Sequence, residues 1–263
     1  MVEHRIAAPK ARKSLAQAVR PGWAEKTRRA PKGRHKGASF ERTNNMNWEY
    51  PATYSDKRGL EMTTIMNDSR NITVLLRGVE FTGVSFDDFE PKPGSDPLLL
   101  EQFTLNKTDL CACQIICNIP LPVVSQSRTV GGILEVQLIL GDPAPNGGLD
   151  RRELALTLQV DGQTYKSRGH SGWFEDELLD LQKSLPSGTY IKACINCAFS
   201  DYSPGGHGLF GSMACFRSCK QEYLEVRTKH DIFRIWNENA GFVQETYLCP
   251  EFETRRPNMG YRG

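Results

Sequence analysis

Apolar and polar residues alternate along much of the chain between residues 60 and 170. This period of two is typical of strands that bury one face and expose the other. It is clearest over residues 72–76, 134–140 and 154–160. Gly78 follows the first of these runs, and we expect a β-bulge there because glycine tolerates distorted backbone. The pattern predicts an antiparallel sheet or sandwich over the middle of the chain.

A turn signal follows the third run. Asp161-Gly162 stands directly after it, and residues 163–165 then resume an extended pattern. Asp-Gly accepts the positive φ angles that a two-residue turn requires. A β-hairpin is therefore predicted at this point.

Beyond residue 170 the period changes to that of a helix. Residues 173–185 carry acidic residues early, Lys183 late and an apolar stripe at helical spacing, and Pro186 follows. Charges placed in this way complement the helix dipole, and proline ends a helix. A strand over residues 189–193 is expected next.

Two further helices and a last strand are predicted near the C-terminus. Ser218 and Gln221 have the spacing of a capping box that would open one helix. Asp231 would cap another, which ends at Gly241. Residues 242–248 have the pattern of a strand.

The complete pattern predicts an α+β protein: an antiparallel β-sheet or sandwich followed by a smaller, helical, cysteine-rich and zinc-stapled C-terminal region. We divide it into a β-rich region over residues 46–170 and an α/β, cysteine-bearing region over residues 171–263 that packs on it. Residues 1–45 are set apart because they lack an apolar period, and they are predicted to be a disordered tail.

The composition is that of an ordinary globular protein. The chain has 263 residues, of which 39% are hydrophobic and 24% are charged. No stretch approaches the ~20 apolar residues of a membrane span, and the N-terminus has no apolar segment of a secretory signal. We therefore expect a cytoplasmic protein whose eight cysteines are thiols or metal ligands rather than disulfides.

The net charge of +2 hides a difference between the tail and the rest of the chain. Residues 1–45 contain twelve Lys or Arg and three Glu, a net of +9, and the remaining 21 basic and 28 acidic residues give −7. Such a tail could bind nucleic acid through counterion release, or it could be a solvated tail without a role. A third interpretation is a misplaced start, because Met46 stands just before the folded-looking sequence.

The cysteines near the C-terminus have the spacing of a tetrahedral zinc site. Cys194 and Cys197 form a Cys-x-x-Cys pair, and Cys215 and Cys249 follow as single residues. Four such thiolates can bind one structural zinc ion. Cys219 is an alternative to Cys215, because it lies only four residues further on. Buried core cysteines and a redox-active Cys-x-x-Cys pair are two other interpretations of the same residues.

The remaining three cysteines lie in the β-rich region. Cys111, Cys113 and Cys117 are separated by even numbers of residues, with Ile115 between them. On one strand their side chains would point to the same face. Residues i and i+2 of a strand lie ~7 Å apart, too far for a disulfide. We interpret these cysteines as small apolar residues of a buried face rather than as a second metal or redox cluster.

A glycine-rich stretch, residues 199–211, lies between the proposed ligands and holds the polar side chains Asp201, Tyr202, Ser203 and His207. His207 could be a zinc ligand in place of a cysteine, or a catalytic base together with Asp201. Alternatively, the glycines only let the backbone turn while Asp201 and Ser203 bind nearby backbone. The sequence has no Gly-rich phosphate loop, His-Glu-x-x-His motif or Gly-x-Ser-x-Gly motif.

Four segments of the chain form a specific signature. They are Cys194-Ile-Asn-Cys-Ala-Phe-Ser-Asp-Tyr-Ser-Pro, Gly208-Leu-Phe-Gly-Ser-Met-Ala-Cys-Phe-Arg, Val243-Gln-Glu-Thr-Tyr-Leu-Cys-Pro-Glu-Phe and Gly260-Tyr-Arg-Gly. With these segments the chain resembles a family of uncharacterised bacterial proteins, from near Trp48 to the C-terminus. The resemblance implies a bacterial, cytoplasmic protein and assigns it no activity.

Together these features predict a non-enzymatic protein-interaction module with a structural zinc site, because four thiolates close a zinc site. The partner is expected to be another protein, by analogy with acidic immunity factors that neutralise toxins. One rival is a zinc-dependent hydrolase, in which zinc activates water and Asp201 or His207 is the base. The other is a nucleic-acid-binding protein that uses residues 1–45.

Overall fold

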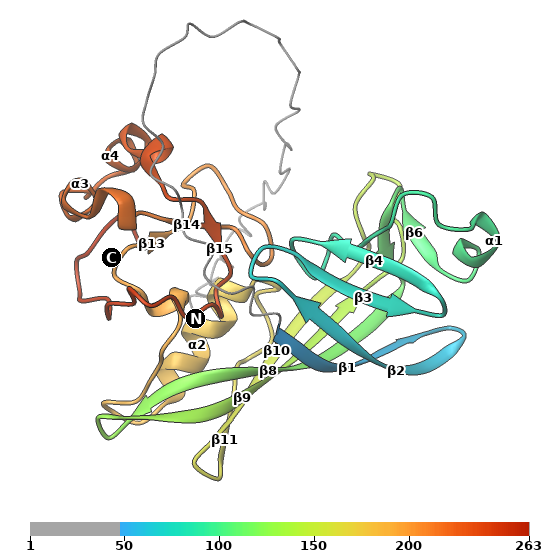
Figure 1. The fold of residues 1–263 in the computed structure, drawn as a ribbon, viewed down its shortest axis with the longest axis horizontal. Helices are drawn as coiled ribbons and strands as arrows, with labels where there is room; N and C mark the ends of the chain where they lie inside the picture. Colours follow the sequence, from blue (N-terminus) through green and yellow to red (C-terminus); the bar gives the residue numbers. More distant parts are fainter. Residues whose placement is uncertain (1–47, 263) are drawn as a thin grey trace, which may run out of the picture. The chain divides into compact units, whose positions relative to one another are not determined.

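The computed structural model describes residues 48–262, and an antiparallel sheet of ten strands is its largest element (Figure 1). Nine strands follow one another in the order β11 (Gln163–Lys166), β10 (Arg152–Val160), β9 (Arg128–Leu140), β8 (Cys113–Ser125), β1 (Trp48–Asp56), β2 (Gly59–Asn67), β3 (Ile72–Leu76), β4 (Val79–Gly83) and β5 (Glu90–Pro91). The tenth, β12 (Tyr190–Ile191), pairs with β8. The expectation of a mostly antiparallel β structure is confirmed.

Short helices and two small sheets make up the rest of the described residues. The helices are α1 (Pro97–Leu100), α2 (Phe174–Ser184), α3 (Lys220–Leu224) and α4 (Lys229–Arg234), with 3₁₀ turns η1 (Cys194–Asn196), η2 (Arg217–Cys219) and η3 (Trp236–Glu238). One small sheet pairs β6 (Thr104–Asn106) with β7 (Asp109–Cys111), and the other has the order β13 (Ser200–Asp201), β14 (Met213–Cys215) and β15 (Phe242–Val243).

The three alternating runs form strands where the sequence pattern predicts them, as β3, β9 and β10. Leu154 of β10 lies opposite Leu138 of β9, and both side chains are fully buried. Asp161 and Gly162 adopt positive φ angles of 50° and 72° between β10 and β11. The predicted hairpin is therefore confirmed.

Gly78 belongs to a turn rather than to a β-bulge. Leu76 of β3 pairs directly with Val79 of β4, which leaves Arg77 and Gly78 as the two turn residues, with φ angles of 45° and 82°. Positive φ at both central positions is the requirement of a type I′ turn. The predicted bulge is wrong because the chain reverses at the glycine instead of continuing through it.

The first three cysteines do not share one strand. Cys111 ends β7, and Ala112, with a φ of 51°, separates it from β8. Cys113, Ile115 and Cys117 of β8 point together into the sheet core, and burial raises the pKa of Cys113 to about 12. Their burial agrees with the interpretation as small apolar residues, whereas the placement of Cys111 on the same strand is wrong.

Helix α2 is the helix predicted over residues 173–185, and it packs against β10 and β11 (Figure 1). Three acidic residues stand in its first turn and Lys183 in its last, which complements the helix dipole. Phe174, Leu178 and Leu181 form its buried face. The helix therefore closes part of the sheet core, as its apolar stripe indicates.

Two helix starts near the C-terminus differ from the prediction. Ser218 is no cap: its hydroxyl donates a hydrogen bond to the carbonyl of Glu238 at 2.5 Å, and α3 begins only after Cys219. Thr228 caps α4, and Asp231 completes the capping box from inside the helix. Asp231 is not the cap because Thr228, three positions earlier, takes that place. Ser218 is not a cap because its hydroxyl bonds to the distant carbonyl of Glu238 instead.

The strand predicted over residues 242–248 ends at Val243. Beyond it, Gln244 and Asn67 of β2 form a reciprocal pair of amide hydrogen bonds, at 2.7 and 3.0 Å. Asn67 also donates to the Tyr50 hydroxyl at 2.7 Å. These buried polar contacts turn the chain away from β14 and fasten it to the large sheet, which shortens the strand.

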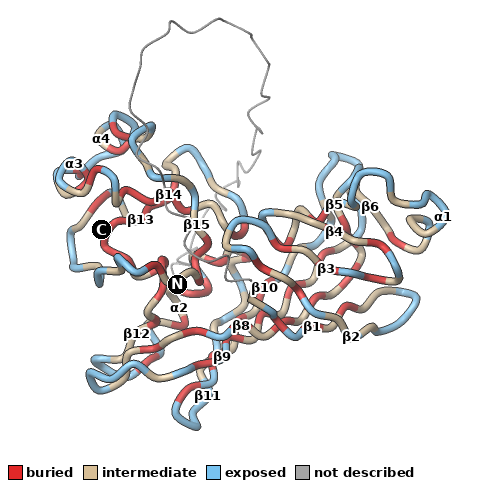
Figure 2. The backbone as a smooth tube through the Cα atoms, in the orientation of Figure 1, coloured by how far each residue is buried: buried red, intermediate tan, exposed pale blue. Residues whose placement is uncertain are grey.

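Buried residues, coloured red in Figure 2, occur both in the large sheet and in the C-terminal segments, and their side chains form two clusters. The larger one, the sheet core, lies between the large sheet and α2. The smaller one, which we call the C-terminal core, is built around Phe216 and Tyr223, whose rings stack 4.9 Å apart. Cys194 belongs to the sheet core and Cys197 to the C-terminal core. The Cys-x-x-Cys pair therefore stands at the boundary between the two cores.

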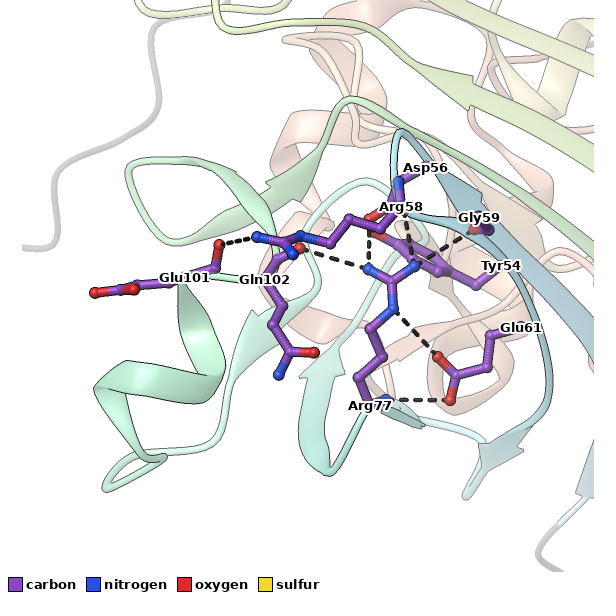
Figure 3. Close-up of polar contacts among 8 residues, drawn as sticks. All are labelled: Tyr54, Asp56, Arg58, Gly59, Glu61, Arg77, Glu101 and Gln102. Atoms are coloured by element: carbon purple, nitrogen blue, oxygen red, sulfur yellow. Dashed lines mark hydrogen bonds and ion pairs between the residues drawn. The ribbon is translucent and has the colours of Figure 1, made fainter.

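An ion-pair cluster ties the β1–β2 hairpin to the β3–β4 turn (Figure 3). The Arg77 guanidinium donates two hydrogen bonds to the Asp56 carboxylate, at 2.7 and 2.8 Å. It lies 5.4 Å from the centre of the Tyr54 ring and 5.6 Å from that of Phe103. The Asp56 side chain is 5% exposed and that of Arg77 16% exposed. A bidentate arginine–carboxylate pair with so little exposure to solvent is stronger than an ordinary surface ion pair.

We expect Asp56→Asn to lower the free energy of unfolding at neutral pH by about 2 kcal/mol, because hydrogen bonding to Arg77 lowers the pKa of Asp56 from 3.8 to about 2. A depressed pKa in the folded state stabilises the protein above the unfolded-state value. The difference between wild type and variant should therefore shrink as the pH falls from 3.8 through about 2. Urea unfolding at several pH values measures both effects.

Glu153→Gln is the control for this substitution. It removes the pair between Arg151 and Glu153, whose side chains are 55% and 52% exposed. We expect a much smaller change than that of Asp56→Asn, because exposed ion pairs contribute little. Equal losses of stability in the two variants would contradict a special role for the buried pair.

Candidate functional site

The Cys-x-x-Cys turn is hydrogen-bonded into the protein on its N–H side. The N–H of Cys197 donates to the carbonyl of Cys194 at 3.0 Å, which closes η1. The N–H of Cys194 donates to the carbonyl of Tyr247 at 2.8 Å, and that of Ile195 to the carbonyl of Glu245 at 2.9 Å. The segment that leads to the last cysteine therefore lies directly beside the turn.

The other two cysteines reach the turn on neighbouring segments. Cys215 ends β14 and pairs with Ser200 of β13, just after the turn. Cys249 follows the segment that binds the turn, and the N–H of Ala198 donates to the carbonyl of Glu253 at 2.7 Å. The chain thus contacts the turn both before and after Cys249.

All four thiols are buried and lie close enough to affect one another's ionisation. Burial raises the pKa of Cys194 well above its ordinary value, and the thiols of Cys197, Cys249 and Cys215 raise it further. Burial also raises the pKa of Cys215 and of Cys249, and each is raised again by Cys197. The four cysteines that the sequence spacing selects therefore interact electrostatically in the structure.

Polar groups that favour a negatively charged sulfur point at two of these thiols. The backbone N–H of Arg217 hydrogen-bonds to the thiol of Cys215, and that of Glu251 to the thiol of Cys249, and each lowers the pKa of its thiol. The Arg217 charge lowers the pKa of both as well. Each donor belongs to the residue two positions after its cysteine, and N–H groups in such places stabilise a thiolate.

The four thiols affect one another's pKa, but they are not positioned as ligands of one ion. As they stand, the side chains of residues 48–262 include no group of three or more His, Cys, Asp or Glu residues arranged to hold a metal ion. Of the two alternative ligands, Cys219 faces the carbonyl of Glu238 at 3.6 Å. His207 pairs with Glu175 at 3.3 Å. Both alternatives are thus engaged with groups outside the set of four.

Two arginines near the C-terminus hold the carbonyl side of the turn. Arg255 donates to the carbonyl of Cys197 at 3.2 Å and to that of Ser200. Arg262 donates to the carbonyls of Ile195 at 2.9 Å and Ser200 at 3.4 Å. The turn is therefore held on both sides, by carbonyls against its N–H groups and by guanidinium groups against its carbonyls.

Asp201 is engaged in a structural role. Its buried carboxylate accepts hydrogen bonds from the Tyr223 hydroxyl at 2.9 Å and from the backbone N–H groups of Tyr202, Tyr261 and Arg262 at 2.9 to 3.1 Å. Four donors fill the acceptor capacity of a carboxylate. This geometry supports the interpretation of Asp201 as a backbone-binding residue over that of a catalytic base.

A second buried carboxylate, Glu245, lies under the glycine-rich stretch. It accepts hydrogen bonds from the N–H of Gly211 at 2.7 Å and from the Tyr202 hydroxyl at 3.0 Å. Burial raises the pKa of Glu245 to about 7, although these hydrogen bonds and the charge of His207 act in the opposite direction. A carboxyl group that titrates near neutral pH can exchange a proton in acid–base chemistry.

His207 lies within the same polar cluster. Its ring is 4.2 Å from the Tyr202 ring and its Nε2 is 3.3 Å from the Glu175 carboxylate. The charges of Glu175 and Glu245 both act on it. The acid–base groups that the structure brings to His207 are therefore these two glutamates rather than Asp201.

The sequence patterns missed Glu175, Glu245 and Arg262. Glu175 is one of three acids in a helical first turn, where the dipole already explains it. Glu245 stands inside the predicted strand over residues 242–248. Gln244 and Glu245 are adjacent polar residues, which breaks the alternation expected of a strand, and this break was the one signal that could have singled them out. Arg262 stands near the end of the chain, where no pattern identifies a buried side chain.

The fold and the site define a class: an antiparallel β protein whose C-terminal segment folds back around a cysteine-bearing turn. The chain belongs to DUF6304, a family of unknown function, whose model matches residues 48–200. The match begins at Trp48, as the resemblance predicts, and includes the Cys194–Cys197 turn, while Cys215 and Cys249 lie beyond it. The expected membership of an uncharacterised family is confirmed.

Neither the search of curated proteins nor that of solved structures found a match to this chain. In the part of the chain that the structure describes, no helix is long and apolar enough to cross a membrane.

We expect Gly260→Ala to lower the free energy of unfolding by about 1–3 kcal/mol, because overpacking is costly. Gly260 has a φ of 69°, and an added Cβ would overlap the hydroxyl of Tyr223, which binds Asp201. The substitution should therefore loosen the C-terminal segment around the turn. Thermal or urea unfolding measures the loss.

Gly131→Ala is the control, since an added Cβ on that residue of β9 meets no atom within 4 Å. It should change the free energy of unfolding by less than about 0.5 kcal/mol. If Gly260→Ala were equally mild, the close packing of the C-terminal segment would be contradicted.

Proposed function

We propose that the protein is a non-enzymatic protein-interaction module whose C-terminal region is stapled by one structural zinc ion on Cys194, Cys197, Cys215 and Cys249. The observation that supports the proposal most is the convergence of these four thiols from separate segments at the boundary between the sheet core and the C-terminal core. An ion bound there would join both cores.

The chemistry of the four thiols fits zinc. Zinc binds thiolates, and four of them complete its tetrahedral coordination in a closed, structural site. Backbone hydrogen bonds hold the turn beside the segment before Cys249, which supports the proposal that the four sulfurs share one ion. Four thiolates and one Zn²⁺ carry a net charge of −2, which the N–H groups of Arg217 and Glu251 and the guanidinium of Arg217 offset.

Metal binding would contribute directly to stability. A site that exists only in the folded chain converts binding free energy into folding free energy. The small C-terminal core around Phe216 and Tyr223 is the part that would gain most, because a small core buries little apolar surface. The proposal also places the protein in the cytoplasm, where thiols stay reduced.

A zinc-dependent hydrolase is the second candidate, and one observation favours it. The charge of His207, in the glycine-rich stretch, acts on Glu245, and burial raises the pKa of Glu245 to about 7. Two considerations weigh against it: a fourth thiolate, as proposed, would leave zinc no position for water, and Asp201 is saturated with hydrogen bonds.

Exposed apolar side chains support a protein partner. Leu60 and Met62 of β2 and Leu75 of β3 are 68%, 74% and 59% exposed. By the alternation of strand residues they face away from buried Ile65 and Val74. Clustered apolar side chains on a soluble surface mark interaction sites. We call these three residues the outer apolar patch.

The nucleic-acid alternative depends on residues 1–45, which lie outside the described residues. It stays a prediction from their charge of +9 and would show as DNA binding that weakens with salt and is lost when these residues are removed.

The zinc proposal predicts about one zinc ion per chain in protein purified without added metal. Cys194→Ser and Cys249→Ser should each lose the ion and lower the melting temperature, because three thiolates hold a structural zinc poorly. Metal analysis of the intact protein and thermal unfolding with and without chelator measure the two effects. Cys215→Ser should behave in the same way and Cys219→Ser should not.

Cys117→Ala is the matched control, because Cys117 is as deeply buried as Cys194 in the sheet core but lies on β8 and is not one of the four candidate ligands. It should lower stability and keep the zinc. Zinc-free wild-type protein with reduced thiols, or equal zinc content in all variants, would contradict the proposal.

The interaction proposal predicts that the double variant Met62→Lys/Leu75→Lys keeps its zinc and its melting temperature but loses its protein partner in affinity capture from the source cells. Leu98→Lys is the control, because Leu98 on α1 is just as exposed, at 73%, and lies outside the outer apolar patch. The same captured proteins with wild type and both variants would show that this patch is not the interaction surface.

A further inference from the structure

His207 lies between two aromatic rings. Its ring centre is 4.2 Å from that of Tyr202, nearly stacked at 31°, and 5.2 Å from that of Trp173, edge-on at 67°. Each of these rings also faces a guanidinium: Arg152 lies 4.6 Å from the Trp173 ring and Arg262 lies 5.7 Å from the Tyr202 ring. Cationic and aromatic groups thus alternate, and a positive charge on the imidazole fits the place between the two rings.

Both ring nitrogens of His207 face hydrogen-bond acceptors. Nδ1 lies 2.9 Å from the carbonyl oxygen of Gly208, and Nε2 lies 3.3 Å from a carboxylate oxygen of Glu175. A neutral imidazole has one N–H, so it can satisfy only one of these acceptors and turns a lone pair towards the other. Only the imidazolium, with two N–H groups, satisfies both.

The charged groups around the imidazole come from several elements and are mostly acidic. Glu175 and Asp176 stand in the first turn of α2 and interact with the charge of His207, as does Glu245. Burial alone would lower the pKa of His207, but the hydrogen bonds to Glu175 and Gly208 and the charges of Glu175 and Glu245 raise it above its ordinary value.

His207 is placed to hold an exposed stretch of backbone. Gly205, Gly206 and Gly208 are exposed, while Tyr202 before them and Phe210 after them are buried. The stretch makes few other ties: the N–H of Gly206 donates to the carbonyl of Ser203 at 3.0 Å, within the loop itself. We call residues 203–208 the glycine loop. Its ties to the rest of the protein include the contact of His207 with Glu175 at 3.3 Å and the hydrogen bond that the Ser212 hydroxyl donates to the Gly208 carbonyl at 3.3 Å.

We propose that His207 is a pH-operated latch: the protonated imidazole holds the glycine loop against Glu175, Trp173 and Tyr202, and its deprotonation as the pH rises releases the loop. Release uncovers the two aromatic rings and gives solvent access to Glu175 and Glu245. The device is independent of zinc, since none of its groups is one of the four thiols.

The direction of the pH effect depends on which state of the loop, closed or open, binds the His207 proton more tightly. The closed loop binds the His207 proton more tightly than the open loop does, so closure is favoured at low pH and is lost as the pH rises through the raised pKa. The buried carboxyl of Glu245 acts in the same direction, because its pKa of about 7 also lies above the ordinary value.

The test is made on the full chain by NMR between about pH 5.5 and about pH 8.5, the range in which histidine titrates. We expect both ring nitrogens of His207 to carry protons at the low end. The protection of the Gly206 amide against hydrogen exchange, corrected for the intrinsic rate, should fall several-fold as the ring loses its proton. In Glu175→Gln the fall should occur at lower pH.

Two substitutions separate the latch from general pH effects. His207→Gln keeps a donor but cannot titrate, so most of the pH dependence at Gly206 should disappear. His230→Gln, on an exposed histidine of α4, should leave the wild-type profile unchanged. A neutral ring at the low end of the range, protection that does not vary with pH, or a wild-type profile in His207→Gln would each overturn the proposal.

Discussion

The two-sided hydrogen bonding of the turn at Cys194–Cys197 is the constraint on which the C-terminal half of the structure depends. The N–H groups of Cys194 and Ile195 bind the carbonyls of Tyr247 and Glu245, and the guanidinium groups of Arg255 and Arg262 bind carbonyls of the same turn. A short turn with so many backbone groups buried must satisfy them all, because an unpaired buried group costs about 1–3 kcal/mol. The chain does so by returning after β15 and wrapping the turn, and this return is what carries Cys249 to the other cysteines.

The same return creates two chemically distinct neighbourhoods. On one side the thiols gather at the boundary between the two cores, with N–H groups and the Arg217 charge directed at them. In the second neighbourhood, Glu245 accepts hydrogen bonds from Tyr202 and Gly211 and interacts with the charge of His207 in the glycine loop. The first neighbourhood fits a structural metal, and the second fits a group that responds to pH. The large sheet carries both and is fastened to them by the Asn67–Gln244 pair.

The sequence predicts the large sheet well and the C-terminal region poorly, for a physical reason. Strands β3, β9 and β10 bury one face and expose the other, so apolar and polar residues alternate along them in the sequence. Asp161-Gly162 is typical of a tight turn. The short elements after α2 are set by long-range contacts instead: Ser218 bonds to Glu238, and Gln244 bonds to Asn67, which ends the predicted strand. The Cys-x-x-Cys spacing predicts four thiols that do interact electrostatically in the structure, and their role as ligands of one ion stays a prediction. Nothing local to Glu245 shows that the returning chain buries it, and nothing local to Arg262 shows that its guanidinium binds the turn.

The central claim is that the returning chain closes a four-thiolate zinc site, and X-ray absorption at the zinc edge on the purified full-length protein tests it most directly. The account predicts four sulfur neighbours at about 2.3 Å from zinc and no oxygen or nitrogen neighbour. Three sulfurs with one oxygen or nitrogen neighbour would contradict it in favour of an open, hydrolase-type site. Protein without zinc would contradict the metal itself.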